Sequence, residues 1–156
     1  MALDTSKYVV TAPNHQHVDS AYRLFCTHRK VPWSLDLFRQ SLLSPHCRVC
    51  MLDNELVGFL IINPIASEAE LEEICVDARF RQQGIAKTML LSAFEQLAKT
   101  NITKLQLEVR EKNTAAITLY KSLGFDLSGR RKNYYNDCGS TGEDALIFTL
   151  IVGHYT

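Results

Sequence analysis

The stretch Arg81-Gln82-Gln83-Gly84-Ile85-Ala86-Lys87 connects a segment typical of a strand to a segment typical of a helix. Residues 71–76 before it form a short, largely apolar run with β-branched side chains. After it, apolar side chains recur at helical spacing as far as Leu97. A helix that starts after such a turn presents unpaired N–H groups and a positive dipole end at one point, and Gly84 would let an anion approach the backbone there. The stretch therefore predicts a site for a phosphate or pyrophosphate group.

The shape of this motif alone leaves a second interpretation, a tight strand-to-helix turn in an α/β core. Two other phosphate-binding patterns are excluded. A P-loop requires Gly-Lys-Ser/Thr four residues after a first glycine, which is absent here. A dinucleotide-binding turn requires the spacing G-x-G-x-x-G, whereas Gly84 stands alone.

The whole chain has the composition of an ordinary globular protein. Its 156 residues fit a single domain, with 46% hydrophobic and 22% charged residues. Lysine plus arginine and aspartate plus glutamate balance at 17 each, which argues against wholesale binding of nucleic acid or anionic membrane. The first residues lack the features of a signal peptide, and the longest apolar run, residues 57–62, is too short to cross a bilayer.

Five scattered cysteines, an odd number, favour a reducing compartment over a disulfide framework. Cys47 and Cys50 have the C-x-x-C spacing found in zinc sites. No second Cys/His pair lies at a matching distance, and the segment continues like a strand. We therefore expect these two residues to be buried or half-buried strand thiols, and we expect no metal.

Periodicity and turn residues predict the element order β-α-α-β-β-β-α-β-α-β-β, a mixed-sheet α/β domain. Ser34 and Asn113 are expected N-caps, and Gly124 is expected to stop the last helix. Strands are expected at residues 8–11, 48–52, 56–65, 70–76, 105–110, in a region from Phe125 that includes 133–135, and at 145–152, with a loop at 137–142.

Glu108 lies on the polar side of the strand that follows the predicted phosphate-binding helix. Strands beside such a helix deliver side chains to the ligand crevice, where a carboxylate can serve as a general base. The alternative is a salt-bridged or solvated glutamate.

Asn113 and Tyr120 are seven residues apart, about two helical turns, and project from nearly the same side. The amide could hydrogen-bond a ligand, and the phenol could protonate a departing thiolate. The alternative is an N-cap and a core aromatic residue.

The turn at residues 81–86 resembles the pyrophosphate motif R/Q-x-x-G-x-G/A of the GNAT superfamily of acetyl-CoA-dependent N-acetyltransferases. Six further segments resemble the bacterial RimI family of ribosomal-protein alanine N-acetyltransferases. They are Ile74-Cys75-Val76-Asp77, Leu107-Glu108-Val109-Arg110, Asn113-Thr114-Ala115-Ala116-Ile117, Leu119-Tyr120-Lys121-Ser122-Leu123-Gly124-Phe125, Asn133-Tyr134-Tyr135 and Gly142-Glu143-Asp144-Ala145. Pro32-Trp33-Ser34 also fits, so the resemblance covers nearly the whole chain.

The resemblance implies one GNAT domain over residues 1–156, with acetyl-CoA in a cleft where two central strands splay. It implies Glu108 as the general base and Tyr120 as the general acid. Backbone groups of Ile74, Cys75 and Val76 would hold the acetyl carbonyl and the pantetheine. Asn113 would contact the cofactor, and the pyrophosphate would be cradled by Gln82, Gln83, Gly84, Ile85, Ala86 and Lys87. The implied substrate is the N-terminal alanine of small-subunit ribosomal protein eighteen, exposed after removal of the initiator methionine.

The chain departs from this family at two places. Gln82 stands where relatives often carry arginine, which Lys87 could partly replace at the phosphate. The loop 136–141 also differs, so we expect any divergence in peptide preference there. We expect a cytoplasmic monomer that contacts neither nucleic acid nor membrane directly.

Alternative functions remain open. They are acetylation of other protein N-termini, lysines or small amines, and a non-catalytic acetyl-CoA-binding module, which would need neither Glu108 nor Tyr120. Direct attack in a ternary complex is favoured over an acyl-enzyme, because the strand position of Cys75 favours packing over nucleophilic attack.

Overall fold

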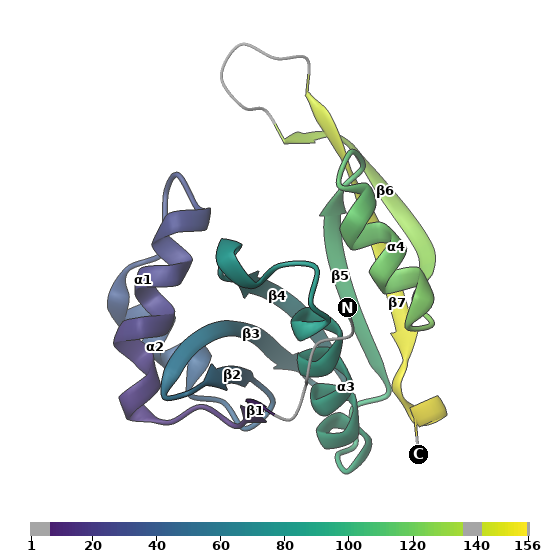
Figure 1. Ribbon diagram of the computed structural model, residues 1–156. Helices are drawn as coiled ribbons and strands as arrows, with labels where there is room; N and C mark the ends of the chain where they lie inside the picture. The colour runs from purple at the N-terminus through teal and green to yellow at the C-terminus, as the bar shows by residue number, and fades with distance from the viewer. Residues whose placement is uncertain (1–6, 136–141, 156) are drawn as a thin grey trace.

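A seven-stranded sheet with the order β1-β2-β3-β4-β5-β7-β6 runs through the molecule (Figure 1). The computed structural model describes residues 7–135 and 142–155, without the side chains of the last two. The strands are β1 (Tyr8–Thr11), β2 (Arg48–Leu52), β3 (Glu55–Ile65), β4 (Glu68–Val76), β5 (Lys104–Arg110), β6 (Asp126–Tyr135) and β7 (Glu143–Ile151). Only the pairing of β4 with β5 is parallel among these strands.

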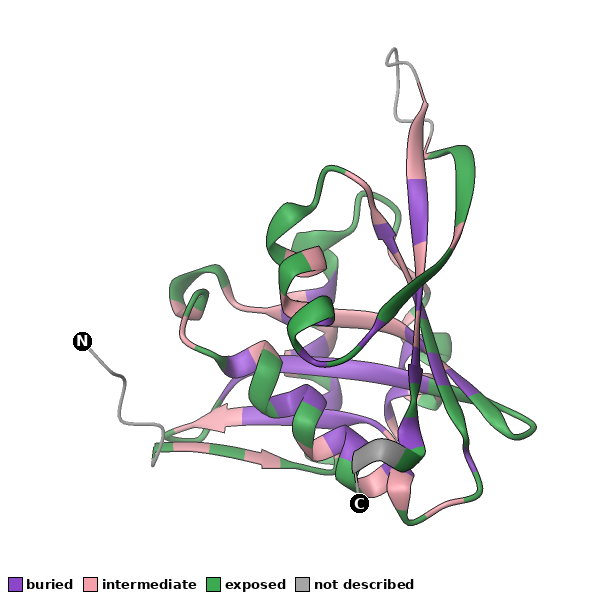
Figure 2. Cartoon of the chain, turned by 90° about the vertical axis from the view of Figure 1, so that its right-hand side faces the viewer, coloured by how far each residue is buried: buried purple, intermediate pink, exposed green. Residues whose placement is uncertain are grey.

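Helices cover both faces of the sheet. They are α1 (Val18–His28), α2 (Leu35–Leu42), α3 (Ile85–Ala98) and α4 (Thr114–Ser122). Helices α1 and α2 form one core with the sheet around Phe25, Phe38 and Phe59. On the other face, α3 and α4 form a second core that includes Phe94 and Tyr120. Buried residues accordingly follow the central strands and the inner sides of the helices (Figure 2). In the part of the chain that the structure describes, no helix is long and apolar enough to cross a membrane.

The predicted element order is confirmed, as are the N-caps. The Ser34 hydroxyl accepts a hydrogen bond from the N–H of Leu37, and Asn113 accepts one from Ala116. The β2–β3 turn consists of Asp53 and Asn54, both with positive φ (47° and 67°), as in a two-residue hairpin turn with φ above zero at both positions. The predicted loop 137–142 lies outside the described residues apart from its last position.

Both thiols of the C-x-x-C spacing are buried, as expected. Cys47 is 3.3 Å from the carbonyl oxygen of Ser41 and 3.7 Å from that of Ile62, and it accepts the N–H of Ile62. These contacts explain Cys47 as a packing residue, and Cys50 is fully buried in the other core. Among the described residues, no group of three or more His, Cys, Asp and Glu side chains could hold a metal ion.

The strands β4 and β5 separate in the middle of the sheet (Figure 1). They pair only from Glu68 with Lys104 to Leu71 with Leu107. Further along, β4 continues with β3, and β5 continues with β7. The edge of β4 that faces β5 therefore has no ladder partner beyond Leu71, and a gap opens between two central strands.

A β-bulge lies where this gap begins. Ile61 pairs with Glu73 and Ile62 with Leu71, so Glu72 is the extra residue. Because an extra residue reverses the alternation of side chains, Leu71 and Ile74 both face the α3 core, whereas Cys75 belongs to the α1–α2 core. The bulge therefore decides which side chains of β4 point to each face of the sheet at the gap.

Candidate active site

Two pockets lie on opposite sides of the gap between β4 and β5. The first has a volume of about 590 Å³ and is lined by four glutamates (Glu70, Glu72, Glu73 and Glu108). We call it the acidic pocket. The second, of about 470 Å³, lies at the start of α3, and we call it the turn pocket. Ile74, Asn113 and Tyr120 line both. Because these residues are shared, a ligand in one pocket can be reached from the other.

The turn pocket includes residues of the stretch 81–87, where the sequence predicts a phosphate site. Gly84 begins α3 with a left-handed φ of 81°, a conformation that favours glycine. A Cβ added there would meet no atom within 4 Å, so the space in front of the turn is open. The carbonyl of Gly84 already accepts hydrogen bonds from the N–H and hydroxyl of Thr88. The preceding N–H groups in the first turn of α3 therefore have no acceptor within the helix, which suits an anion.

Five of the six residues predicted at the phosphate line this pocket, namely Gln82, Gly84, Ile85, Ala86 and Lys87. Gln83 does not, because its side chain accepts a hydrogen bond from the Tyr8 hydroxyl at 2.6 Å. Gln82 itself has a left-handed φ of 60°. The side-chain oxygen of Gln83 therefore ties the turn to β1.

The three residues predicted on β4 are divided between the pockets. Val76 lines the turn pocket, Cys75 lines the acidic pocket, and Ile74 lines both. Cys75 is buried, and that burial, with the charge of Glu73, raises the pKa of its thiol to about 12. A neutral, packed thiol is a poor nucleophile, so the prediction that Cys75 packs is confirmed.

Tyr120 lies at the junction of the two pockets. It is only 5% exposed and packs edge-to-face against Phe125, with ring centroids 5.6 Å apart. Burial chiefly, and the nearby charge of Glu73, raise the pKa of this phenol to about 12. Tyr120 is therefore protonated at neutral pH and can donate a proton.

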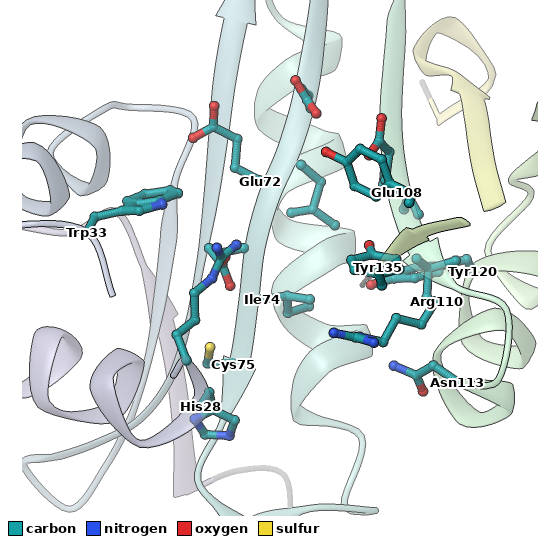
Figure 3. A pocket seen from close by; sticks show the side chains of 17 residues that line it. His28, Trp33, Glu72, Ile74, Cys75, Glu108, Arg110, Asn113, Tyr120 and Tyr135 are labelled. Carbon is teal, nitrogen blue, oxygen red and sulfur yellow. The ribbon is translucent and has the colours of Figure 1, made fainter. Parts of the chain in front are cut away.

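Glu108 projects from β5 into the acidic pocket (Figure 3). Its carboxylate forms an ion pair with the Nε of Arg131 on β6 at 2.9 Å. The nearby charge of Glu108 also contributes, after burial and Glu72, to a raised pKa of Glu70. Glu108 therefore forms a salt bridge and also lines a pocket, and its role as a general base stays a prediction.

Asn113 is the predicted N-cap and also lines both pockets. Its side-chain oxygen caps α4 by accepting the N–H of Ala116 at 3.2 Å. Its NH₂ group carries two donors that capping does not use. Since Asn113 lines both pockets, these donors lie where a ligand would cross the gap.

Several pocket residues were not predicted from the sequence. Arg29, at the end of α1, forms an ion pair with Glu73 of β4. Arg110 lies over the ring of Tyr135, 4.1 Å from its centroid, and pairs with Glu143 at 3.1 Å. Figure 3 shows Arg110 and Tyr135 on the Glu108 side of the pocket, opposite Trp33. One signal was available in the sequence. Glu73 directly precedes the apolar residues Ile74, Cys75 and Val76, and a carboxylate that is buried with such residues needs a charged or hydrogen-bonding partner.

The chain is similar in sequence to known proteins. The sequence model of the acetyltransferase (GNAT) family matches residues 12–125. A [ribosomal protein bS18]-alanine N-acetyltransferase from Escherichia coli (strain K12) is 33% identical over 132 residues, 84% of this chain and 88% of that protein. A protein of the same name from Haemophilus ducreyi is 38% identical over 122 residues, 77% of this chain and 83% of that protein.

Solved structures share the fold. The crystal structure of the ribosomal-protein-S18-alanine N-acetyltransferase from Escherichia coli superposes with a TM-score of 0.82 at 29% identity, covering 93% of this chain and 94% of that one. Arabidopsis thaliana Naa50, in complex with the bisubstrate analogue CoA-Ac-MVNAL, shares the fold with a TM-score of 0.78 at 17% identity, over 92% of this chain and 98% of that one.

Proposed function

Because the chain belongs to the GNAT family of acetyltransferases, we propose that it transfers the acetyl group of acetyl-CoA to the N-terminal alanine of ribosomal protein bS18. The observation that carries this proposal is the pair of pockets that meet at Tyr120. The open first turn of α3 suits a pyrophosphate. The carboxylates of Glu70, Glu72 and Glu108 in the acidic pocket suit an α-amine, which is cationic for part of the time near neutral pH.

The residues divide the chemistry between the two pockets. Glu108 accepts the proton of the incoming α-amine, directly or through a water molecule. Tyr120 donates a proton to the sulfur that leaves. Asn113 and the edge of β4 beyond Leu71 offer polar groups to the acyl and pantetheine part of the substrate. The amine attacks directly in a ternary complex, since Cys75 is held as a neutral thiol.

An α-amine needs only a base of modest strength to become a nucleophile. Its pKa is roughly 7.7–8.0, so removal of one proton near neutral pH makes it a good nucleophile. The remaining work is positioning of the two substrates and polarisation of the carbonyl. The separation of the pockets by the strand gap supports positioning, because each substrate approaches from its own side.

The proposal is tested by mass spectrometry of acetyl transfer to a panel of acceptors. The panel contains a peptide with the bS18 N-terminus, the same peptide with a blocked α-amine, peptides with other first residues, a lysine peptide with a blocked N-terminus, and a polyamine. The alanine-starting peptide should be acetylated on its α-amine and preferred by a wide margin. Preferential acetylation of the lysine peptide or the polyamine would instead support the alternative acceptors.

The Gly84→Val variant should lose acetyl-CoA binding. A β-branched residue is strained at the positive φ of Gly84, and its side chain would enter the open space in front of the α3 N-terminus. Acetyl-CoA at about 100 times its Kd should raise the Tm of the wild type by about 5–10 °C, and that shift should vanish in the variant.

A matched control is Gly124→Val, since Gly124 also has a positive φ, of 96°, but ends α4 and does not line the turn pocket. This control should have a lower Tm and keep the full shift with acetyl-CoA. An equal shift in Gly84→Val and the wild type would place the cofactor elsewhere.

Two further proposals concern where the enzyme acts and how it binds acetyl-CoA. We propose that it acts as a monomer in the cytoplasm, where bS18 is made and the initiator methionine is removed. We also propose that Lys87, exposed at the turn pocket, supplies the cation that Gln82 lacks. Lys87→Met should therefore weaken acetyl-CoA binding more than Gln82→Ala does.

A further inference from the structure

An ion pair closes one wall of the acidic pocket. Arg29 is the C-cap residue of α1, and its guanidinium bonds the carboxylate of Glu73 on β4. The same guanidinium lies 5.6 Å from the ring centroid of Trp33 and 5.8 Å from that of Phe25. Two aromatic faces and one carboxylate therefore hold Arg29 in place.

A charged glutamate at position 73 costs desolvation free energy, because its side chain is largely buried. The bulge at Glu72 turns its side chain toward the α1–α2 face, where it is only 11% exposed. Burial, and to a smaller extent Glu72, raise the pKa of the Glu73 carboxyl, and Arg29 opposes them. The transfer reaction proposed above assigns no proton or contact to Glu73. Its presence in the pocket therefore needs a separate account.

Glu73 and Tyr120 line the same pocket, so the charge of the carboxylate acts on the phenol. Burial is the main cause of the raised pKa of Tyr120, and the charge of Glu73 is the second cause. An anion near the phenol makes proton donation harder. It also opposes the negative charge that develops on the acyl oxygen and on the leaving sulfur during transfer. An uncompensated Glu73 would therefore slow the reaction.

We propose that Arg29 is a positioning residue of the active site, the fixed counter-ion that neutralises Glu73 and so keeps the junction at Tyr120 favourable for proton donation. The inference rests on the proposed function, because it concerns donation by Tyr120. It predicts that Arg29 is required only while Glu73 carries its charge.

The test is a double-mutant cycle on the full chain with wild type, Arg29→Met, Glu73→Gln and the double variant. It is assayed at about pH 9, where the peptide amine is largely neutral. Arg29→Met should lower kcat about tenfold, the change that corresponds to one pKa unit of interaction, with the KM for acetyl-CoA unchanged. Glu73→Gln should be close to wild type, and the double variant should be within about twofold of Glu73→Gln.

Two further variants separate charge from packing. Arg29→Lys keeps a positive charge beside Glu73 but loses the planar stacking on the rings. If charge is what matters, this variant should stay within about threefold of the wild type. Arg110→Met removes the other arginine that lines the pocket, one that pairs with Glu143 rather than Glu73. Any loss in Arg110→Met should not be relieved by Glu73→Gln. The acetyl-CoA thermal shift should persist in Arg29→Met, which shows that the variant is folded.

Three results would overturn the inference. The first is a wild-type kcat in Arg29→Met. The second is an equal loss in Arg29→Met with and without Glu73→Gln, which would reduce Arg29 to a packing residue against Trp33. The third is a large loss in Glu73→Gln alone, which would give Glu73 its own part in the reaction. A wild type inactive on alanine peptides would refute the proposed acceptor instead, and the same cycle would then be measured with the amine that the enzyme does use.

Discussion

Tyr120→Phe is expected to lower kcat by about 10²-fold or more, with little change in the affinity for acetyl-CoA. The variant keeps the ring, which packs against Phe125 in the α3–α4 core. It removes only the hydroxyl, which in the proposed mechanism protonates the leaving sulfur. The negative charge on that sulfur develops in the same buried setting that raises the pKa of the phenol, so an internal donor is hard for solvent to replace.

The measurement is steady-state acetyl transfer to an alanine-starting peptide, together with the acetyl-CoA thermal shift. Tyr135→Phe is the matched control, because Tyr135 lines the acidic pocket and its ring would still stack on Arg110. It should stay within about threefold of the wild type. Unimpaired turnover in Tyr120→Phe would make Tyr120 a packing residue only.

The pH profile of the wild type offers a second check on Tyr120. Burial raises the pKa of this phenol to about 12, so the protonated donor is present at all pH values well below 12 and is lost only as the pH approaches that value. Consequently kcat should show no alkaline decline below about pH 10 that depends on Tyr120. A decline with a midpoint near pH 9 that disappears in Tyr120→Phe would contradict the assignment.

Glu108→Gln is expected to slow acetyl transfer strongly at neutral pH, by about 10²-fold, while the fold and acetyl-CoA affinity are kept. The amide has nearly the same shape and can still accept a hydrogen bond from Arg131, but it cannot take a proton from the amine. The deficit should shrink as pH rises, because more of the peptide is then already neutral, with a midpoint near the α-amine pKa of about 8.

The decisive measurement is kcat/KM against pH for the wild type and for Glu108→Gln. Glu70→Gln is the control, since Glu70 lines the same pocket and its replacement removes one negative charge as well. That variant should show no deficit that depends on the pH. A pH-independent loss in Glu108→Gln would assign Glu108 to holding the amine or an ordered water, and equal rates would remove it from the mechanism.

The local features of this protein could be predicted from its sequence because they depend on neighbouring residues. The periodicity of apolar side chains placed the strands and helices in their order along the chain. Ser34 and Asn113 cap helices through contacts three residues away. Gly84 has the positive φ that a glycine at a strand-to-helix turn suggests. The roles of Glu108 and Tyr120 in the reaction stay predictions.

The arrangement of the site depends on contacts that only the folded chain makes. The gap exists because β4 and β5 pair only as far as Leu71, and the bulge at Glu72 then directs Glu73 toward α1. Arg29 lies 44 positions before Glu73 in the chain, so no local pattern links them. Side-chain alternation along a strand follows from neighbouring residues, whereas strand pairing and the Arg29–Glu73 ion pair depend on contacts between residues far apart in the chain. The sequence therefore determined the elements and the glycine turn before α3, and the tertiary structure alone decided which charges surround Tyr120.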